Sequence, residues 1–300
     1  MARKQILDLF EKYVDPFRVT KGESFRLKDF DPGSTCGLQL DKGEAANLLQ
    51  QGTAWLANEQ EMLYAQDRRS LLIIFQAMDA AGKDSTIKHV MSGINPQGCQ
   101  VFSFKHPTYV DISHDFLWRY ARCLPERGRF GIFNRSYYED VLIVRVHEEI
   151  LRGEKLPPEL TGKHIWDERL SDIARFEEYL TRQGTTVLKF FLHMSRKEQK
   201  KRLLARLDRP EKHWKFSVAD LKEREFWDDY MDAYEKAIRA TALKHAPWFV
   251  VPADNKWFTR IVVAAAIVTT LEKFGLTYPE VSKETKKDIA AARAALTDGA

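Results

Sequence analysis

The stretch Leu71-Leu-Ile-Ile-Phe-Gln-Ala-Met-Asp-Ala-Ala-Gly-Lys-Asp-Ser-Thr86 indicates a buried strand that leads directly into a phosphate-binding loop. The apolar run 71–75 is typical of a strand covered on both faces, and a helical run over 84–91 follows the turn. Gly82 permits close backbone approach, Lys83 supplies a positive charge, and the N–H groups of a helix N-terminus favour an anion. The predicted phosphate-binding residues of the loop are Ala80, Ala81, Gly82, Asp84 and Ser85.

Two positions of this loop depart from the common phosphate-loop pattern G-x-x-x-x-G-K-[ST]. Ala77 stands where the first glycine belongs, and Asp84 stands where a hydroxyl that binds Mg²⁺ belongs. Asp79 is also unexpected, because a carboxylate repels phosphates unless a cation lies between them. An ordinary strand–turn–helix connection is the alternative interpretation. The strand before the loop, the helix after it and the hydroxyls of Ser85 and Thr86 favour phosphate binding.

The composition predicts a cytoplasmic protein. The 300 residues are 44% hydrophobic, which suits one large domain or two small ones. The N-terminus leads into a short mixed helix rather than an apolar region, so no signal peptide is predicted. The most apolar later run, 261–271, is too short and too interrupted by Thr to cross a bilayer, so no membrane partner is expected. The three cysteines lack metal or redox spacing and are interpreted as reduced thiols.

The chain divides into an N-terminal arm, a main domain and a tail. Residues 1–44 contain Asp-Pro and Pro-Gly turn signals and many charges, which predicts a peripheral arm with little core. Residues 45–280 are predicted to form the main domain. Residues 281–300 are rich in Lys and Ala and predict an exposed helix as a C-terminal tail.

Strand-like and helical segments alternate along the main domain. This alternation predicts an α/β fold with a parallel sheet and helices on both faces, joined by right-handed crossovers. The predicted strands are 71–77, 100–104, 129–133, 186–192 and 248–252. The predicted helices are 44–68, 84–93, 113–124, 137–152, 165–183, 196–207, 218–243 and 256–274.

Polar side chains follow four of the predicted strands, where ligands bind in sheets of this kind. They occupy 79–83, 105–108, 134–140 and the residues from His193 onward. After the third strand, Arg135 is suited to grip a phosphate with its planar guanidinium. Asn134 stands where a metal-binding Asp is expected, and Glu139 and Asp140 could supply the missing charge. A helix start with acidic residues that complement its dipole is the alternative for these two carboxylates.

A basic segment extends from Ser195 to Phe216. Its surplus of Lys and Arg exceeds the mild net charge of +4 of the whole chain, and that net charge by itself gives no argument for nucleic acid. Arg202, Arg206 and Arg209 repeat at helical spacing and share one face. A solvated face is the preferred interpretation for Lys197, Lys200 and Lys201. For the rest, an ordered basic lid that closes over a polyanion is favoured, although any linear phosphate polymer, nucleic acid included, would satisfy these charges.

The chain resembles the family-2 polyphosphate kinases over roughly residues 25–280. Five ordered motifs carry the resemblance. They are Ala77-Met-Asp-Ala-Ala-Gly-Lys-Asp84, Gly93-Ile-Asn-Pro-Gln-Gly98, Phe133-Asn-Arg-Ser-Tyr-Tyr-Glu-Asp140, Arg206-Leu-Asp-Arg-Pro-Glu-Lys-His-Trp-Lys215 and Ala246-Pro-Trp-Phe-Val-Val-Pro-Ala253. The resemblance implies a three-layer α/β/α P-loop kinase fold similar to thymidylate kinase, with a helical lid at about 196–220. It also implies transfer of the terminal phosphate of inorganic polyphosphate to ADP or AMP, with Mg²⁺ or Mn²⁺.

The resemblance also implies roles for individual residues. Asp79, Lys83 and Arg135 would be catalytic, and Asp79 would share the metal with Glu139 and Asp140. The implied nucleotide-binding residues are Lys105, Asn134, Tyr138 and Glu139. The implied polyphosphate-binding residues are Arg202, Arg206, Arg209, Lys212 and Lys215. Asn134 departs from one large group of the family, which carries Asp there, and looks more like the subgroup that accepts both AMP and ADP.

Two other functions remain open at the level of sequence. An ATP-dependent nucleoside or nucleotide kinase would use the same fold, and a P-loop module that binds nucleic acid would use the basic segment without phosphoryl transfer. Polyphosphate-dependent phosphoryl transfer is the preferred interpretation, with ADP, AMP and ATP as partners and no nucleic acid. A homo-oligomer (dimer or tetramer) is also expected, in which the polar arm could serve as a contact.

Overall fold

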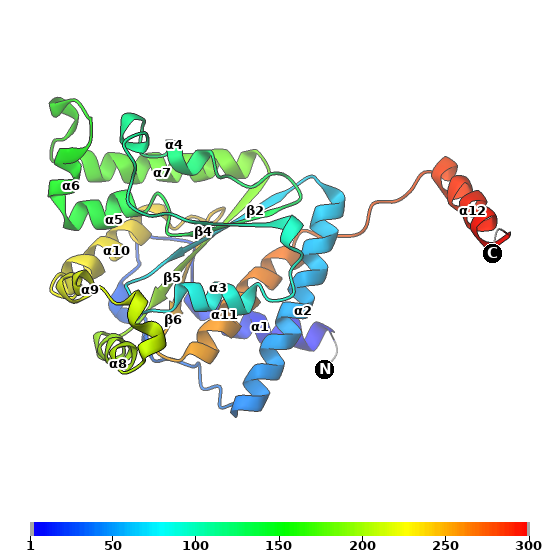
Figure 1. The fold of residues 1–300 in the computed structure, drawn as a ribbon, viewed down its shortest axis with the longest axis horizontal. Helices are drawn as coiled ribbons and strands as arrows, with labels where there is room; N and C mark the ends of the chain where they lie inside the picture. The colour runs from blue at the N-terminus through cyan, green and yellow to red at the C-terminus, as the bar shows by residue number, and fades with distance from the viewer. Residues whose placement is uncertain (1–2, 299–300) are drawn as a thin grey trace.

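The computed structural model describes residues 3–298, apart from the side chains of Lys215 and Asp298. In these residues six strands form one sheet in the order β1-β6-β5-β2-β4-β3 (Figure 1). β1 pairs with β6 in antiparallel fashion, and the other neighbours pair in parallel. The strands are β1 (Arg18–Val19), β2 (Ser70–Gln76), β3 (Cys99–Ser103), β4 (Phe130–Asn134), β5 (Thr185–His193) and β6 (Trp248–Pro252). The five strands expected from the sequence are confirmed to within one residue.

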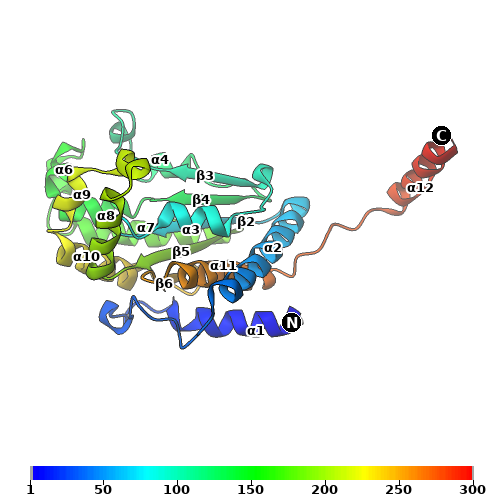
Figure 2. The same cartoon turned by 60° about the horizontal axis from the view of Figure 1, so that its bottom comes forward.

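Helices cover both faces of the sheet, as Figures 1 and 2 show. The side chains of β2 alternate between two cores: Leu71, Ile73 and Phe75 belong to one, and Leu72 and Ile74 to the other. The first core packs against α1 (Arg3–Val14), α2 (Lys42–Gln66), α3 (Lys83–Val90) and α11 (Lys256–Glu272). The second packs against α5 (Glu139–Val146), α7 (Ile165–Arg182) and α10 (Trp227–Thr241). The predicted α/β fold with helices on both faces of a parallel sheet is confirmed.

Three predicted helices are shorter or divided. Of 113–124, only α4 (Trp118–Ala121) is α-helical, after a 3₁₀ turn at Asp111–Ser113. The run 137–152 divides into α5 and α6 (Glu148–Gly153), because His147 between them leaves the helical conformation at φ −116° and ψ 73°. The run 218–243 divides into α9 (Val218–Glu223) and α10. Apolar periodicity continues across each break, so periodicity alone could not locate them.

The expectation that residues 1–44 contribute little core is wrong. α1 packs against α11, and Phe10, Tyr13 and Phe17 are buried. The rings of Tyr13 and Phe17 lie edge-on to Phe258, with centroids 6.3 and 5.9 Å apart. The short strand β1 then joins the sheet beside β6. The apolar residues of α1 stand at helical spacing among many charged residues, and the charges conceal the buried face of the helix.

The C-terminal helix α12 (Lys283–Asp298) stands away from the body of the protein (Figures 1 and 2). All of its described side chains are exposed, which confirms the predicted exposed helix. Among the described residues, no helix combines the length and apolar character needed to cross a membrane.

Candidate active site

The phosphate loop joins the end of β2 to the start of α3. Two of its residues adopt left-handed backbone conformations, Ala80 at φ 64° and Gly82 at φ 101°. This conformation costs an ordinary L-residue about 1–2 kcal/mol, so surrounding contacts must hold Ala80 in place. Such alternation of backbone conformation aims successive N–H groups into a concave site that suits an anion.

Lys83 folds back over this loop. Its Nζ donates to the carbonyl oxygen of Ala77 at 2.7 Å. Burial lowers the pKa of Lys83, and the nearby carboxylate of Asp79 opposes that effect. In the same helix turn, Ser85 Oγ accepts a hydrogen bond from Arg260 Nη2 at 2.9 Å. The lysine therefore lies inside the loop, where a phosphate would meet its charge.

Arg135 connects the phosphate loop with α5. It follows β4 in a left-handed conformation at φ 68°, and its backbone N–H donates to Phe75 O at 3.1 Å. Its guanidinium lies between two carboxylates, 3.7 Å from Asp79 Oδ1 and 3.5 Å from Glu139 Oε2. Burial raises the pKa of Glu139, while Arg135 and Lys83 oppose this. The structure thus brings together four of the predicted site residues.

Asn134 links three elements at the edge of the sheet. Its Nδ2 donates to Asp84 Oδ1 at 2.8 Å and to Ser103 Oγ at 3.2 Å. Asp84 belongs to the first turn of α3, and Ser103 ends β3. The side-chain amide of Asn134 therefore joins the first turn of α3 to the end of β3.

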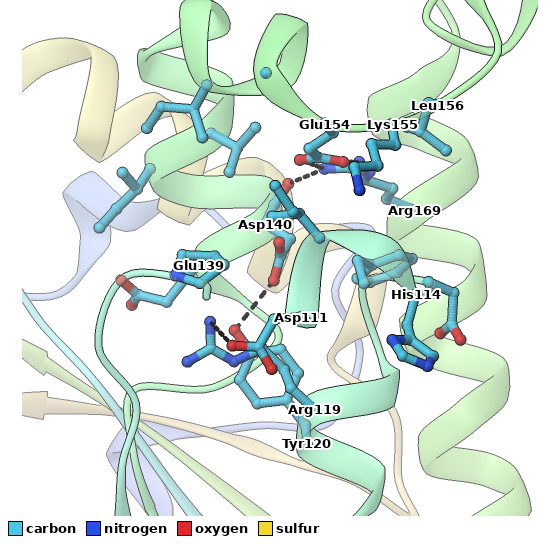
Figure 3. Close-up of a pocket in the computed structure, with 18 of the residues that line it drawn as sticks. Asp111, His114, Arg119, Tyr120, Glu139, Asp140, Glu154, Lys155, Leu156 and Arg169 are labelled. Atoms are coloured by element: carbon cyan, nitrogen blue, oxygen red, sulfur yellow. Dashed lines mark hydrogen bonds and ion pairs between the residues drawn. The ribbon is translucent and has the colours of Figure 1, made fainter. Parts of the chain in front are cut away.

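A cavity of about 830 Å³ opens beside Arg135 and Glu139 (Figure 3). Lys105, which is exposed, and Arg119 contribute positive charge to its wall. Arg119 Nη2 donates to Lys105 O at 2.8 Å, its Nη1 lies 3.8 Å from Asp111 Oδ2, and its guanidinium lies over the rings of Phe104 and Tyr120. The apolar wall includes Phe116, Ile143, Val144, Ile150, Leu156 and Ile165. Arg119 was not among the predicted site residues, because the spacing of a short helix such as α4 does not show which of its side chains face a cavity.

Asp140 does not join Asp79 and Glu139. Its Oδ2 accepts from the hydroxyl of Tyr120 at 3.2 Å, and Figure 3 shows Glu139 and Asp140 pointing in different directions. Burial raises the pKa of Asp140 to about 7, with Arg169 opposing, so a proton competes with any cation there. Over residues 3–298, no three His, Cys, Asp or Glu side chains gather as a metal site would need. The predicted three-carboxylate set is therefore not assembled.

Tyr138 is fully buried beneath the site. Its hydroxyl and that of Tyr137 donate to Glu177 Oε1, at 2.9 and 3.0 Å. Lys189 pairs with the other oxygen of Glu177 and donates to Thr241 O at 2.7 Å. Because Tyr138 has no exposed surface, its placement is inconsistent with the predicted nucleotide contact. The tyrosine instead anchors the turn that carries Arg135 and Glu139.

The basic segment forms a lid from α8 (Arg196–Leu207), a 3₁₀ segment (Pro210–Lys215) and α9. Arg206 Nη1 pairs with Asp220 Oδ2 across the lid at 2.7 Å. Burial raises the pKa of Asp220, and the negative charge of Asp79 adds to the effect. Gln199 Nε2 of α8 donates to Asp79 O at 3.0 Å, so the lid faces the phosphate loop. Arg209 is exposed and Lys212 half-buried, whereas the side chain of Lys215 lies outside the described part of the chain.

Arg202 behaves differently from these lid residues. It is buried, and its guanidinium donates to the carbonyl oxygens of Ala80 and Ala81, at 3.3 and 2.8 Å. It also donates to Ala253 O and Asp254 O, at 2.6 and 3.0 Å. A guanidinium engaged in this way is not available to a polymer, so its predicted polyphosphate contact is inconsistent with the structure. Arg202 and Arg206 share a helix face, but only the tertiary fold decides which of them is covered.

Comparisons with known proteins identify relatives that cover most of the chain. The family model for polyphosphate kinase 2 (PPK2) matches residues 39–277. An ADP-polyphosphate phosphotransferase of Rhodopseudomonas palustris is 52% identical over 274 residues, which cover 91% of this chain and 94% of that protein. An AMP/ADP-polyphosphate phosphotransferase of Meiothermus ruber is 43% identical, over 90% of this chain and 97% of that protein.

A solved structure gives the same result at the level of the fold. The crystal structure of polyphosphate kinase 2 from Arthrobacter aurescens superposes with a TM-score of 0.85 at 43% sequence identity. The match covers 95% of this chain and 96% of the other. With its phosphate loop, its paired arginine and its basic lid in the order that the sequence motifs imply, the chain belongs to the polyphosphate kinase 2 family.

Proposed function

We propose that this protein transfers the terminal phosphoryl group of inorganic polyphosphate to ADP and AMP, and in reverse from ATP to polyphosphate. The position of Arg135 carries the proposal: it lines the large cavity and also contacts Asp79 of the phosphate loop. The guanidinium of Arg135 is therefore within reach of both a phosphate in the loop and a molecule in the cavity. The names of the relatives from Rhodopseudomonas palustris and Meiothermus ruber support the same substrates.

Polyphosphate approaches from the lid in this proposal. Arg206, Arg209, Lys212 and Lys215 bind the chain, and the loop around Gly82 holds its terminal phosphates. A linear polyanion favours such a row of positive charges, because each contact releases a bound counterion. Arg206 exchanges its carboxylate partner Asp220 for phosphate oxygens when the polymer enters.

The nucleotide occupies the cavity. Its volume of about 830 Å³ suits a nucleotide, since small-molecule sites usually measure about 300–1,000 Å³. Lys105 and Arg119 face its phosphates, and Glu139 lies on the wall beside Arg135. Asn134 is assigned to the same substrate from its position beside the start of α3, where its amide donates to Asp84. Aromatic and apolar side chains make up much of the remaining wall and suit the base and sugar.

The transfer is direct and in line. An oxygen of the nucleotide's terminal phosphate forms the new P–O bond while the bond to the rest of the polymer breaks, and the polymer leaves one phosphate shorter. The acceptor phosphate is ionised at neutral pH, so no side chain has to remove a proton. Lys83 and Arg135 neutralise the charge on the transferred group, and positioning supplies the rest of the rate.

Membership of a kinase family implies a divalent metal ion, and we propose Mg²⁺ or Mn²⁺. Carboxylate oxygens are the ligands that Mg²⁺ prefers, and Asp79 and Glu139 present theirs on either side of Arg135. Asp79, supported by Glu139, would hold the ion together with phosphate oxygens. When bound, the ion supplies positive charge that turns the repulsion between Asp79 and the phosphates into attraction.

Lys83→Ala tests the catalytic assignment. Loss of this charge should lower the rate of ATP formation from polyphosphate and ADP by roughly 10²–10³-fold, while the protein stays folded. Lys88→Ala, which removes an exposed lysine from the same helix, serves as the matched control and should keep the native rate. A Lys83→Ala variant with near-native turnover would refute the assignment. ATP consumption with a nucleoside acceptor and no use of polyphosphate would instead identify a nucleoside kinase.

We also propose that the protein works in the cytoplasm as a dimer or tetramer. The exposed apolar side chains of Ile289 and Leu296 on α12 support a contact between copies, and the three free cysteines support a reducing compartment. Light scattering coupled to gel filtration on the full chain measures the oligomer directly. A monomer at micromolar concentration would contradict the proposal.

A further inference from the structure

The carbonyl groups of three successive residues in the phosphate loop turn toward α8. Gln199 Nε2 donates to Asp79 O at 3.0 Å. Arg202 Nη1 donates to the next two carbonyls, those of Ala80 and Ala81, at 3.3 and 2.8 Å. Gln199 and Arg202 lie one turn apart on α8 and are both buried. One face of α8 therefore binds the side of the loop that carries these carbonyl groups.

This arrangement fixes the direction of the loop's N–H groups. In a trans peptide, a carbonyl and the following N–H point in opposite directions. Carbonyls that face α8 therefore direct the N–H groups of Ala80, Ala81 and Gly82 away from it. The N–H of Ala81 donates to Met78 O at 3.3 Å, which closes the turn. Hydrogen bonds from α8 also hold Ala80 in its left-handed conformation and offset the strain of that conformation.

Arg202 is built into the fold as a buried cation with a full set of acceptors. Its Nε donates to Glu198 Oε1 at 2.8 Å, and its Nη2 donates to Ala253 O and Asp254 O in the connection after β6. A guanidinium has five N–H groups, and these contacts together with those to the loop supply five acceptors. The side chain thereby joins α8, the phosphate loop and the end of β6, and leaves its positive charge directly behind Gly82.

We propose that Arg202, assisted by Gln199, is a positioning residue that sets the phosphate loop in its anion-binding geometry before the substrate arrives. The proposal rests on the proposed function for the identity of the anion, a terminal phosphate of polyphosphate. The two ends of α8 then have different roles. The part with Gln199 and Arg202 is fixed to the loop, whereas Arg206, one turn later, belongs to the substrate-binding lid. A lysine at position 202 would keep the charge but lose the planar set of donors.

The first test measures the binding of inorganic tripolyphosphate to the full chain by calorimetry. Arg202→Ala should weaken binding roughly 10- to 100-fold, because two charge-assisted hydrogen bonds to the loop are lost. Lys200→Ala, which removes an exposed lysine from the same helix, should bind like the native chain. Millimolar guanidinium should restore much of the affinity of Arg202→Ala, and urea at the same concentration should not. Unchanged affinity in Arg202→Ala, or no binding by the native chain, would overturn the proposal.

Chain length separates positioning from direct contact with the polymer. If Arg202 acts through the loop, Arg202→Ala should lose the same factor of affinity for tripolyphosphate and for long polyphosphate. Arg206→Ala should instead lose more with the long chain, because the lid contacts phosphates beyond the loop. A loss for Arg202→Ala that grows with chain length would mean that Arg202 binds the polymer itself, which would overturn the proposal.

Two milder variants keep the test decisive if Arg202→Ala does not fold. Arg202→Lys and Gln199→Leu each remove part of the hydrogen bonding to the loop and should weaken tripolyphosphate binding by about 3- to 10-fold. Native affinity in both would overturn the proposal. ATP formation by the native chain is measured alongside: its absence would refute the proposed function, whereas the tripolyphosphate results decide the positioning role separately.

Discussion

Arg135 shows how this site places charge by backbone geometry. An arginine at φ 68° is uncommon, and its conformation is stabilised by a hydrogen bond to Phe75 O and by the anchored tyrosines that follow. The strained turn directs the guanidinium between Asp79 and Glu139, where it contacts the loop and lines the cavity. Strain of this kind persists where the surrounding structure determines it, which is typical of functional sites.

Asp140 gives a prediction about the pH dependence of stability. Burial raises its pKa from the ordinary value of 3.8 to about 7, so the folded state binds more protons than the unfolded state between these values. Its contribution to the free energy of unfolding therefore falls as the pH rises from about 4 to about 7. Asp140→Asn removes this loss, so the variant should gain about 3 kcal/mol relative to the native chain between pH 5 and pH 8.

Urea unfolding at the two pH values measures this gain. Asp8→Asn, at an exposed position on α1, serves as the control and should show the same stability difference from the native chain at both. A stability difference between Asp140→Asn and the native chain that does not vary with pH would contradict the assignment of a raised pKa.

The contact between β4 and α3 predicts the outcome of a charge exchange. Asn134→Asp places a second carboxylate against Asp84 and removes the amide donor of the 2.8 Å hydrogen bond. The resulting repulsion should lower kcat/KM with ADP by about 10-fold or more. Asp84→Asn combined with Asn134→Asp restores one donor and one acceptor in exchanged places and should recover part of that loss. Steady-state kinetics on the two single variants and the double variant give the coupling energy. Strict additivity of their effects would show that the pair does not act as a unit.

The buried pair of Glu177 on α7 and Lys189 on β5 holds the second core and the turn above it. Glu177→Gln leaves the Lys189 ammonium buried without its partner and should lower the free energy of unfolding by about 3–5 kcal/mol. Adding Lys189→Met should recover much of this stability, because the unpaired charge is removed. Glu178→Gln, at the half-exposed neighbouring position, is the matched control. Thermal unfolding that moves no further in Glu177→Gln than in Glu178→Gln would contradict the structural role of the pair.

Elements with a strong local pattern could be predicted from the sequence, and those that depend on tertiary contacts could not. The apolar run 71–75 specifies β2, and the polar residues after each strand point to Asp79, Lys83, Arg135 and Glu139, because parallel strands end at one edge. Arg202 looked equivalent to Arg206, since burial is decided by the loop and by the β6 connection rather than by spacing. Tyr138 stood among functional residues, but its side chain points to the core.

In the whole molecule, the lid and the large cavity both border one charged cluster. This cluster consists of Asp79, Lys83, Arg135 and Glu139. α8 and α9 form a basic lid on one side of the phosphate loop, and the cavity beside Arg135 extends toward α4, α5, α6 and α7 (Figures 1 and 3). In the proposed function, this arrangement lets a polymer and a nucleotide bind at the same time with their terminal phosphates close together. Direct transfer requires this simultaneous binding, and a single shared site would forbid it.

In the proposed reaction, polyphosphate itself donates the phosphoryl group to a nucleotide. The most direct measurement incubates the full chain with Mg²⁺, polyphosphate of defined length and either ADP or AMP, and quantifies nucleotide products and polymer length together. We expect ATP from ADP, and ADP followed by ATP from AMP, with one phosphate lost from the polymer for each phosphoryl group gained. Nucleotide that stays unphosphorylated while the polymer keeps its length would show that polyphosphate is not the donor.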